Sequence, residues 1–474
     1  MSFKPRKQPN KRKGLVFGAL LLGLGAIASY QAVIAQTQRS NTKSFTDWCT
    51  STLSSREQAT VTALLAEAET ENCAEAEQAL DQVTELSLTD EIYTLQPLAS
   101  LNNLTTLRLE KSQVTNLSPL TNLTNLRSLS IRDRSSINNI DLSAIAKLTQ
   151  LEELSLTNVR IDSLIPIAEL SNLQSLHLRD NRNFSRRSLD PIDISPLAAL
   201  SQLTELSIAN NGIDSIDFLT NFQSLNSLSL PNNDIVQIPP LTPLASLEKL
   251  DLSGNRISDL SPLANQPTLQ QTLTELNLGF NDIEELSPLS QLNALETLNL
   301  DGNRITDISD LGHLKNVKTL YLNDNQLENL AQLAAWTQLR ELSLKQNRLT
   351  DISFLSPLTQ LTTLNIAFNR IENVTVLSSL ASLIKLDASV NSIEDVSPLA
   401  NLTQLEDVII SINKIRDVSS LAPLTNLNRL LLSENPLAEK TCPVPDVTES
   451  SICISVNAWP TASFLNNDKS RTIS

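Results

Sequence analysis

The chain has 474 residues, 41% hydrophobic and only 3% aromatic, which is ample for a large core and by length alone would suggest about three domains. It holds 36 Lys and Arg against 52 Asp and Glu, and six of the basic residues but no acidic one lie in the first 35 positions. Without that segment, 30 basic residues oppose 52 acidic ones, a net charge of −22 that disfavours nucleic acid as a general partner.

Residues 1–35 have the pattern of an export signal. The basic stretch KPRKQPNKRK precedes an apolar run over 14–28, and small residues that suit cleavage occur at 26–28 and 33–35. We predict a cleaved signal peptide. The alternatives are an uncleaved membrane anchor over 15–35 and, less favoured, a cytoplasmic protein. Because no second long apolar run occurs in the sequence, we expect contact with a membrane only through this segment.

A helical cap is predicted over 36–82. Ser54 or Ser55 suits the start of one helix, and a second, shorter helical piece begins near Cys73. The cap precedes the first copy of a repeated pattern, and a stack of repeats needs its exposed ends covered. A second cap loop and a polar tail are predicted over 441–474.

The four cysteines form two close pairs, Cys49 with Cys73 and Cys442 with Cys453. An exported chain meets an oxidising compartment, so we predict two disulfides, one in each cap. Neither pair has the Cys-x-x-Cys spacing of a redox pair, the spacings are not those of a zinc ribbon, and His177 and His313 are the only histidines. We therefore predict no metal site and no cofactor.

A frame L-x-x-L-x-L-x-x-N repeats along 83–440, in most places every 22 residues. Twelve copies carry asparagine at the last position: Asn181, Asn211, Asn233, Asn255, Asn281, Asn303, Asn325, Asn347, Asn369, Asn391, Asn413 and Asn435. Degenerate copies place Val159, Arg134, Ser112 and Glu91 there, which makes about 16 repeats. A catalytic residue occurs once or twice, so a residue repeated this often is architectural. We predict that these asparagines bond backbone groups of adjacent turns and form an asparagine ladder.

Each copy divides into a strand and a return segment. Two leucines before the asparagine, such as Leu298 and Leu300, alternate inward, and the stretch after it reads ISDLSPL or similar. Four prolines are expected at one phase of that stretch, where they favour the first turn of a helical piece: Pro262, Pro288, Pro357 and Pro398. The pattern predicts an α/β solenoid, an arc with a parallel β-sheet on its concave face and 3-10 turns or short helices on its convex face.

This 22-residue pattern resembles the internalin-type leucine-rich repeat proteins of bacteria over about residues 83–440. The resemblance implies an exported binding protein that grips a partner on its concave sheet. No cell-wall sorting motif and no immunoglobulin-like domain follows the repeats, so we expect neither wall attachment nor a role in host invasion.

Two repeats are enlarged just after the asparagine position, at 132–139 and 181–193. They are two repeats apart, which would place them about 10 Å from each other along one edge of the sheet. Arginines gather there as candidates for contact with an acidic partner: Arg132, Arg134, Arg179, Arg182, Arg186 and Arg187. The alternative is that both loops are tolerated surface insertions.

Large side chains interrupt the small, polar flanks of the strands. Phe280 and Phe368 share a phase four repeats apart, and Tyr321 lies between them. They are candidate aromatic anchors in a protein interface, although packing of each phenylalanine on the adjacent turn is the favoured interpretation. An apolar group near the end of the repeats contains Val390, Ile409, Ile412 and Leu431. We expect the C-terminal cap to cover this group, and the alternative offers it to a partner.

Binding is predicted rather than catalysis, because the repeats use nearly every residue over 83–440 and leave no catalytic domain. We expect a monomeric interaction module, periplasmic, extracellular or anchored facing outward, whose partner is an unidentified protein. The alternative is a surface adhesion or polysaccharide-binding structural protein, which the scattered Trp48, Trp336 and Trp459 argue against. Intracellular regulation of kinases or phosphatases is a third interpretation, which the export signal and the paired cysteines disfavour.

Overall fold

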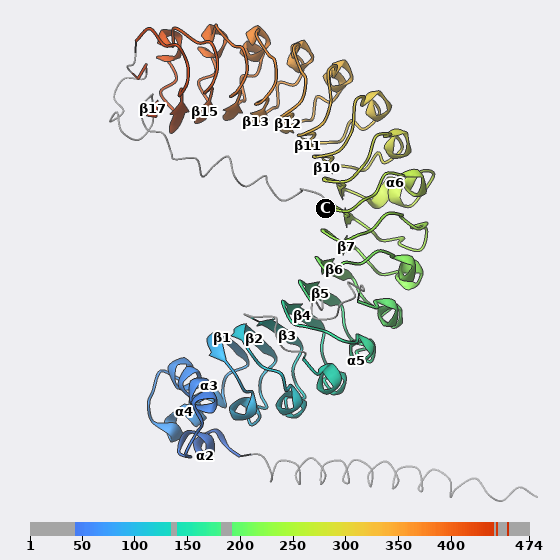
Figure 1. Ribbon diagram of the computed structural model, residues 1–474, viewed down its shortest axis with the longest axis vertical. Coiled ribbons are helices and arrows are strands. Elements are labelled where there is room, and N and C mark those ends of the chain that lie inside the picture. Colours follow the sequence, from blue (N-terminus) through green and yellow to red (C-terminus); the bar gives the residue numbers. More distant parts are fainter. Residues whose placement is uncertain (1–42, 134–139, 182–191, 440–441, 444–452, 455–474) are drawn as a thin grey trace, which may run out of the picture.

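The computed structural model describes residues 43–133, 140–181, 192–439, 442–443 and 453–454. The predicted signal or anchor over 1–35 and the end of the predicted tail, 455–474, lie outside these ranges. Within the described ranges, every helix is too short or too polar to span a bilayer. The described chain forms an open arc, with the strands on its inner side and the short helical turns on its outer side (Figure 1).

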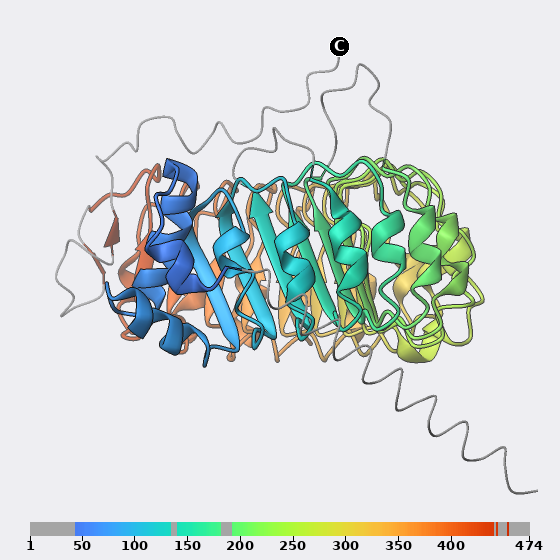
Figure 2. The same cartoon turned by 90° about the horizontal axis from the view of Figure 1, so that it is seen from below.

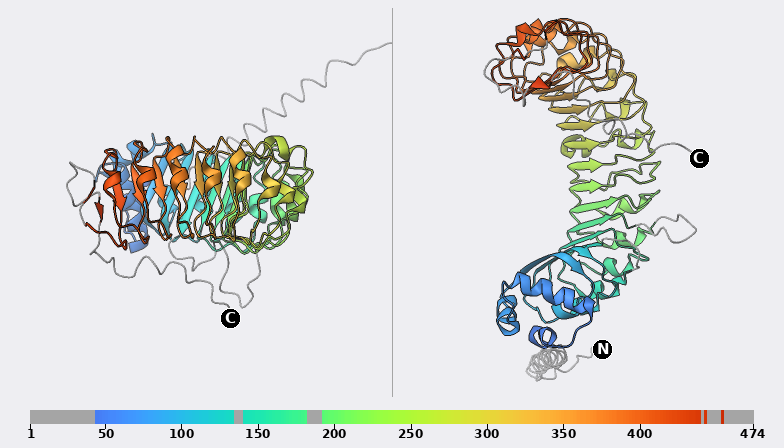
Figure 3. Two further views of the ribbon diagram at one scale, coloured as in Figure 1. Left: turned by 90° about the horizontal axis from the view of Figure 1, so that it is seen from above. Right: turned by 60° about the vertical axis from the view of Figure 1, so that its left-hand side comes forward.

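One parallel sheet follows the whole arc, and successive repeats contribute successive strands to it (Figures 1 and 3). Leu298 lies beside Leu320 and Asn299 beside Tyr321, so neighbouring repeats pair position by position. The repeat strands are β1 (Glu85–Ile92), β2 (Thr106–Ser112), β3 (Ser128–Asp133), β4 (Glu153–Thr157), β5 (Ser175–Arg179), β6 (Glu205–Ala209), β7 (Ser227–Ser229), β8 (Lys249–Asp251), β9 (Glu275–Asn277), β10 (Thr297–Asn299), β11 (Thr319–Tyr321), β12 (Glu341–Ser343), β13 (Thr363–Asn365), β14 (Lys385–Asp387), β15 (Asp407–Ile409) and β16 (Arg429–Leu431). The predicted solenoid and its concave parallel sheet are confirmed.

Most return segments form short helical turns on the convex side (Figure 1), but the segment between β7 and β8 contains none. They are η1 (Gln96–Leu98), η2 (Ser118–Asn122), η3 (Leu142–Lys147), α5 (Ile165–Ala168), η4 (Ser195–Ala199), η5 (Asp217–Asn221), η6 (Ser261–Leu263), α6 (Leu269–Thr272), η7 (Ser287–Leu289), η8 (Ser309–Leu311), η9 (Ala331–Ala335), η10 (Ser353–Leu355), η11 (Thr375–Ser379), η12 (Ser397–Leu399) and η13 (Ser419–Leu421), where η denotes a 3-10 turn.

Prolines start several of the 3-10 turns. Pro262, Pro288 and Pro398 are the second residues of η6, η7 and η12. The expectation that Pro357 shares this phase is wrong, because it follows η10 and Phe354 takes the equivalent position. In this repeat the buried side chain of Phe354 stands where those three turns have a proline.

An aspartate two residues before a serine also starts many of these turns. The carboxylate of Asp307 accepts hydrogen bonds from the hydroxyl of Ser309 at 2.7 Å and from its backbone N–H at 2.9 Å. These bonds favour the charged form and lower the pKa of Asp307. Asp259 and Asp351 bond Ser261 and Ser353 in the same way. The motif therefore closes the turn with side-chain acceptors where helical bonds are lacking.

Leucine packing between neighbouring coils makes one continuous core. In the repeat around Asn303, the strand residues Leu298 and Leu300 and the following Ile305 are fully buried. Ile308 and Leu311, from the return segment, close the same coil at 1% exposure. Each coil buries its apolar residues only against its neighbours, so the stability of the array depends on stacking.

Three helices cover the first repeat: α2 (Phe45–Cys49), α3 (Ser55–Glu67) and α4 (Cys73–Leu80) (Figure 2). Ser54 caps α3, and Glu57 accepts a hydrogen bond from the Ser54 backbone N–H in return. The Cys49–Cys73 disulfide joins the end of α2 to the start of α4, which confirms that predicted bond. The short helix α2 is an addition to the two helical pieces expected from the sequence.

A strand that the sequence did not suggest extends the other end of the sheet. The two residues of β17 (Cys453–Ile454) pair with β16, so that Ile454 lies beside Leu431. Cys442 is disulfide-bonded. The side chain of Cys453 lies outside the described residues, so the pairing of these two cysteines stays a prediction.

The first repeats are shifted by one residue from the predicted frame. The structure places Ile92 and Asp133 beside Ser112, whereas the sequence put Glu91 and Arg134 at that position. The register shifts after Leu88 in β1 and after Leu109 in β2, because each of these strands has one more residue there than the strand that follows it. The shift gives the buried position to Ile92, whose side chain is fully buried, instead of to Glu91.

Candidate interaction surface

The twelve asparagines form a hydrogen-bonded ladder just behind the ends of the strands. The amide nitrogen of Asn303 donates to the carbonyl of Leu278 in the preceding repeat and to that of Leu300 in its own, each at 3.0 Å. Its amide oxygen accepts from the backbone N–H of Ile283 at 3.1 Å. Because Asn303 is 8% exposed, this amide serves the backbone and offers little surface to a ligand.

The residue directly before each ladder asparagine stands in the left-handed region of backbone space, with φ between +50° and +64°. The positions, which we call the left-handed ridge, are Asn158, Asp180, Asn210, Asn232, Gly254, Phe280, Gly302, Asp324, Gln346, Phe368, Val390, Ile412 and Glu434. The first of them, Asn158, precedes the degenerate Val159. Asn, Asp and Gly adopt this conformation readily, whereas large and β-branched residues rarely do.

Backbone bonds between repeats hold the left-handed ridge in place. The N–H of Phe280 donates to the carbonyl of Asp301, and the N–H of Ile412 donates to that of Ser433 at 2.8 Å. The conformation is therefore imposed by stacking on the next repeat and does not depend on the ridge side chain. The ridge runs along the edge of the concave sheet at which the strands end.

The concave face carries rows of polar side chains at the flanking strand positions. Their bases are half-buried by neighbours, and they bond across repeats: Lys249 reaches Glu275 at 2.7 Å, and Arg429 reaches Asp407 at 2.6 Å. Such exposed ion pairs contribute little to stability. These ion pairs hold the side chains of the inner face in place. The leucine core does not depend on them.

His177 stands among serines and glutamates on the inner face, in a shallow hollow of 260 Å³. Its Nε2 lies 2.9 Å from the Ser175 hydroxyl and 3.8 Å from a carboxylate oxygen of Glu205. In a catalytic triad the acid holds the other ring nitrogen, so that Nε2 is left for the nucleophile. Here both groups approach the same nitrogen. This trio is therefore a polar surface cluster without triad geometry.

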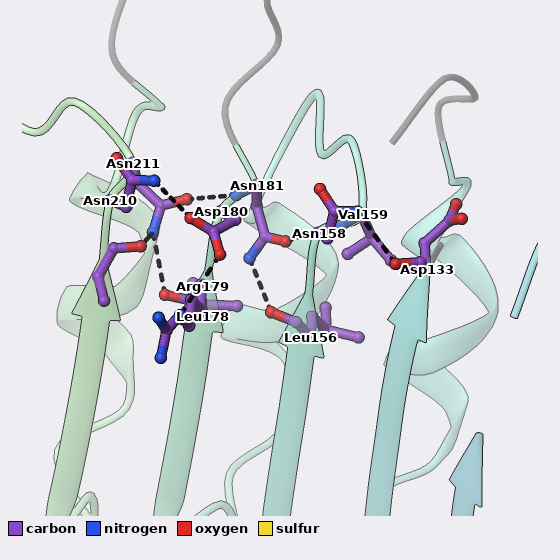
Figure 4. A network of polar contacts seen from close by, with 11 residues as sticks. Asp133, Leu156, Asn158, Val159, Leu178, Arg179, Asp180, Asn181, Asn210 and Asn211 are labelled. Atoms are coloured by element: carbon purple, nitrogen blue, oxygen red, sulfur yellow. Dashed lines mark hydrogen bonds and ion pairs between the residues drawn. The ribbon is translucent and has the colours of Figure 1, made fainter. Parts of the chain in front are cut away.

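The arginine-rich edge is built on the ends of β3 to β6 (Figure 4). Arg132 and Arg179 are exposed and flank Thr157 in one row, as the sequence predicted for two strands separated by a third. The guanidinium of Arg179 lies 3.3 Å from the carboxylate of Asp180. Arg134, Arg182, Arg186 and Arg187 lie outside the described residues, so their part in this site stays a prediction.

Beneath this edge the polar network is dense (Figure 4). Asn181 donates to the carbonyl of Leu156 at 2.8 Å and accepts from the N–H of Val159 at 2.9 Å. Asn211 accepts from the N–H of Asn181 at 2.9 Å and donates to the carbonyl of Leu178 at the same distance. The strand ends on both sides of the enlarged repeats are thus tied together.

The structure separates the three aromatic candidates into two settings. Tyr321 lies on the concave face, where burial and then the nearby carboxylate of Glu341 raise the pKa of Tyr321 to about 12. Phe280 and Phe368 lie on the left-handed ridge, 57% and 42% exposed. Phe280 covers Gly302, since a Cβ on that glycine would be 2.5 Å from the ring. Packing on the adjacent turn therefore occurs and still leaves more than half of Phe280 in solvent.

A half-buried aspartate lies between these two settings. Asp301 accepts a hydrogen bond from the backbone N–H of Asn323 at 2.6 Å, and its own N–H donates to the side chain of Asn299 at 2.9 Å. Burial raises the pKa of Asp301 despite the hydrogen bonds from Asn323. The centre of the inner face thus holds a carboxylate whose ionisation works against folding.

Sequence reasoning missed the left-handed ridge and the aspartate–serine turns. A signal for the ridge was present, because Asn, Asp or Gly precedes the ladder asparagine in six of the twelve copies. A second set of asparagines was also missed at the opposite ends of the strands, where Asn125 donates to the carbonyl of Asn102 and Asn316 to that of Asn293.

Comparison with known proteins agrees with this geometry. The family described as leucine-rich repeats in two copies matches residues 223–265, 271–313, 294–335 and 337–379. A search of the curated proteins finds no match. Among solved structures, an internalin of Listeria monocytogenes, InlF, shares 28% identity with a TM-score of 0.55, over 73% of this chain and 93% of that chain.

Two further structures are similar. A leucine-rich repeat protein of Leptospira interrogans shares 26% identity with a TM-score of 0.65, over 78% of this chain and 94% of that chain. The functional domain of InlJ from Listeria monocytogenes, which includes a cysteine ladder, shares the fold at 22% identity and a TM-score of 0.53, over 83% of this chain and 76% of that chain. The repeat pattern, the arc and these likenesses together show that the chain is an internalin-like leucine-rich repeat protein.

Proposed function

We propose that the protein is an exported binding module that holds a protein partner against its concave sheet and the edge where the strands end. One observation carries the proposal: the core consists of inward leucines and ladder asparagines, so the exposed side chains of the inner face lie outside the core and can serve recognition. Repeat arrays use such extended concave surfaces for binding. The Cys49–Cys73 disulfide supports an oxidising location.

A binding role is favoured over catalysis and over polysaccharide recognition. Ser175, His177 and Glu205 lack triad geometry, as described above. Sugar binding favours exposed aromatic rows, but Trp336 is 1% exposed and Trp48 is packed in the cap. The arginine edge around Arg132 and Arg179 supports an acidic contact region on the partner.

Photo-crosslinking from the full chain tests the proposal. A photoreactive residue at Asn299, on the concave face, should capture the partner, and one at the exposed convex Gln291 should not. Replacing Arg132 and Arg179 with Ser should weaken partner binding more at low salt than at high salt. Equal capture from both faces would contradict a concave binding site. N-terminal sequencing of the mature protein separately tests export and cleavage.

A further inference from the structure

Three consecutive repeats near the end of the left-handed ridge carry apolar residues on it. They are Phe368, Val390 and Ile412, at φ values of +54°, +54° and +57°, and the acidic Glu434 follows them as the last ridge residue. Phe368 and Ile412 are each 42% exposed. We call these three residues the apolar ridge segment. Strand β17 extends the sheet beyond Leu431 but leaves Ile412 in solvent, so the described part of the C-terminal cap does not cover this group.

These side chains disfavour folding in two ways. A left-handed backbone is unfavourable for any residue with a Cβ and most unfavourable for the β-branched Val390 and Ile412. Phe368 and Ile412, each 42% exposed, also gain only part of the stabilisation that full burial would give. The backbone needs no apolar side chain here, because the N–H groups of Phe368 and Ile412 donate to Ser389 and Ser433 of the next repeats whatever the side chain is. Strain of this kind, kept at an exposed position, indicates function.

Basic residues border the apolar ridge segment. The ammonium group of Lys345 lies 5.2 Å from the centre of the Phe368 ring, and Arg370 and Lys414 follow the ladder asparagines of the first and third repeats. This is unusual, because residues 191–440 hold 14 basic and 29 acidic residues. Glu372 and Glu394 come three residues after the ladder asparagines of the first and second repeats.

An arginine equivalent to Arg370 is paired with a carboxylate in another repeat. Arg304 binds Asp282, which stands at the same position one repeat earlier, at 2.7 Å. The position that Asp282 would occupy for Arg370 is held by Arg348, which also carries positive charge. The Phe368 end of the apolar ridge segment is therefore basic, whereas Glu434 follows on the ridge at the Ile412 end, and a partner carboxylate near Phe368 would complement this arrangement.

We propose that the apolar ridge segment docks an extended segment of the protein partner that carries apolar side chains and flanking carboxylates. The inference rests on the proposed binding function and names the chemistry of one contact. Its three residues stand on adjacent strands, so they offer a strip roughly 10 Å long. The concave neighbours Ala367, Ser389 and Ser411 are small and buried, so the strip is accessible from the sheet side.

The test uses the full chain and a fluorescent peptide of alternating Leu and Glu, measured by fluorescence anisotropy. We expect binding that weakens with salt and that is lost when Leu is replaced by Ser or Glu by Lys in the peptide. Replacing Phe368, Val390 and Ile412 together by Asn should weaken binding about tenfold or more without lowering the melting temperature, because Asn tolerates the left-handed backbone. Arg370→Gln should weaken it in a salt-dependent way.

Ile165→Asn is the control. It removes an apolar side chain that is 62% exposed, but on the convex turn α5 and away from the ridge. It should leave peptide affinity unchanged. Unchanged affinity in the triple variant would overturn the proposal, and so would a marked drop in melting temperature, which would make the three side chains structural.

Other occupants would give different results. Peptide binding that appears only after deletion of 455–474 would show that this chain's own end fills the site. A dimer in sedimentation that the triple variant disperses would assign it to a second copy. Either result would overturn the docking of a partner segment. Crosslinking from Asn299 is independent of all of them, so the proposed binding function can stand if the peptide fails.

Discussion

Replacing Asn303 with Leu tests whether the ladder asparagines are architectural. Leucine has a similar size, so the change removes hydrogen bonds without opening a large cavity. Asn303 donates to the carbonyls of Leu278 and Leu300 and accepts from the N–H of Ile283. The substitution should lower the free energy of unfolding while leaving partner affinity nearly intact.

The magnitude follows from what each group loses. The Leu278 and Leu300 carbonyls keep bonds from Asn281 and Asn325, so each loses only one of two donors. The N–H of Ile283 is left buried without Asn303 as its acceptor, which costs about 1–3 kcal/mol. With about 1 kcal/mol for each lost bond to a carbonyl, we expect a total of about 3–5 kcal/mol.

Urea unfolding and hydrogen exchange measure this effect. Because repeats contact only their neighbours, loss of amide protection should concentrate around Ile283 and Asn303. Asn329→Ala is the control, since it removes one exposed bond, from the N–H of Ala331. If the Asn303 variant unfolded at the same urea concentration as the unsubstituted protein, the architectural role would be refuted. If it lost partner binding at unchanged stability, Asn303 would be a ligand-binding residue.

Three further predictions concern single contacts. Gly302→Ala should lower the free energy of unfolding by about 1–2 kcal/mol, because φ is +61° there. Adding Phe280→Ala should restore only the part of this loss that comes from the contact between the new Cβ and the Phe280 ring, which unfolding of the double mutant checks. Asp301→Asn should stabilise the protein at neutral pH, since burial raises the pKa of Asp301, and a pH series of melting temperatures should show the gain vanish below about pH 4. Reducing Cys49–Cys73, which closes a sequence separation of 24, should cost about 3 kcal/mol and lower the amide protection of α4 alone; a loss throughout the repeats would contradict a local cap.

Most of the repeat architecture could be predicted because it is local and recurs. Leu298, Leu300 and Asn303 stand at fixed offsets, and the same offsets return every 22 residues, so one correct frame assigns the register of many strands. The frame was wrong where copies are degenerate. At Glu91 and Arg134 a one-residue shift in the strand carried another side chain into the buried position.

The candidate surface was less predictable. The sequence placed Phe280, Phe368, Val390 and Ile412 near the strand edge, but a single position cannot reveal a left-handed backbone that its own side chain disfavours. The two residues of β17 were missed because so short a strand has no pattern of its own and forms only against β16.

By itself, the amino-acid sequence determined the coil: its period, its inward leucines and the asparagine that ends each strand, because these depend on spacing along the chain. Only the stacked structure decided which exposed residues share a surface and which backbone angles they adopt, because both come from hydrogen bonds to the neighbouring repeat. The apolar ridge segment shows the difference, since its three residues are 22 positions apart in sequence and follow three strands that are adjacent in space.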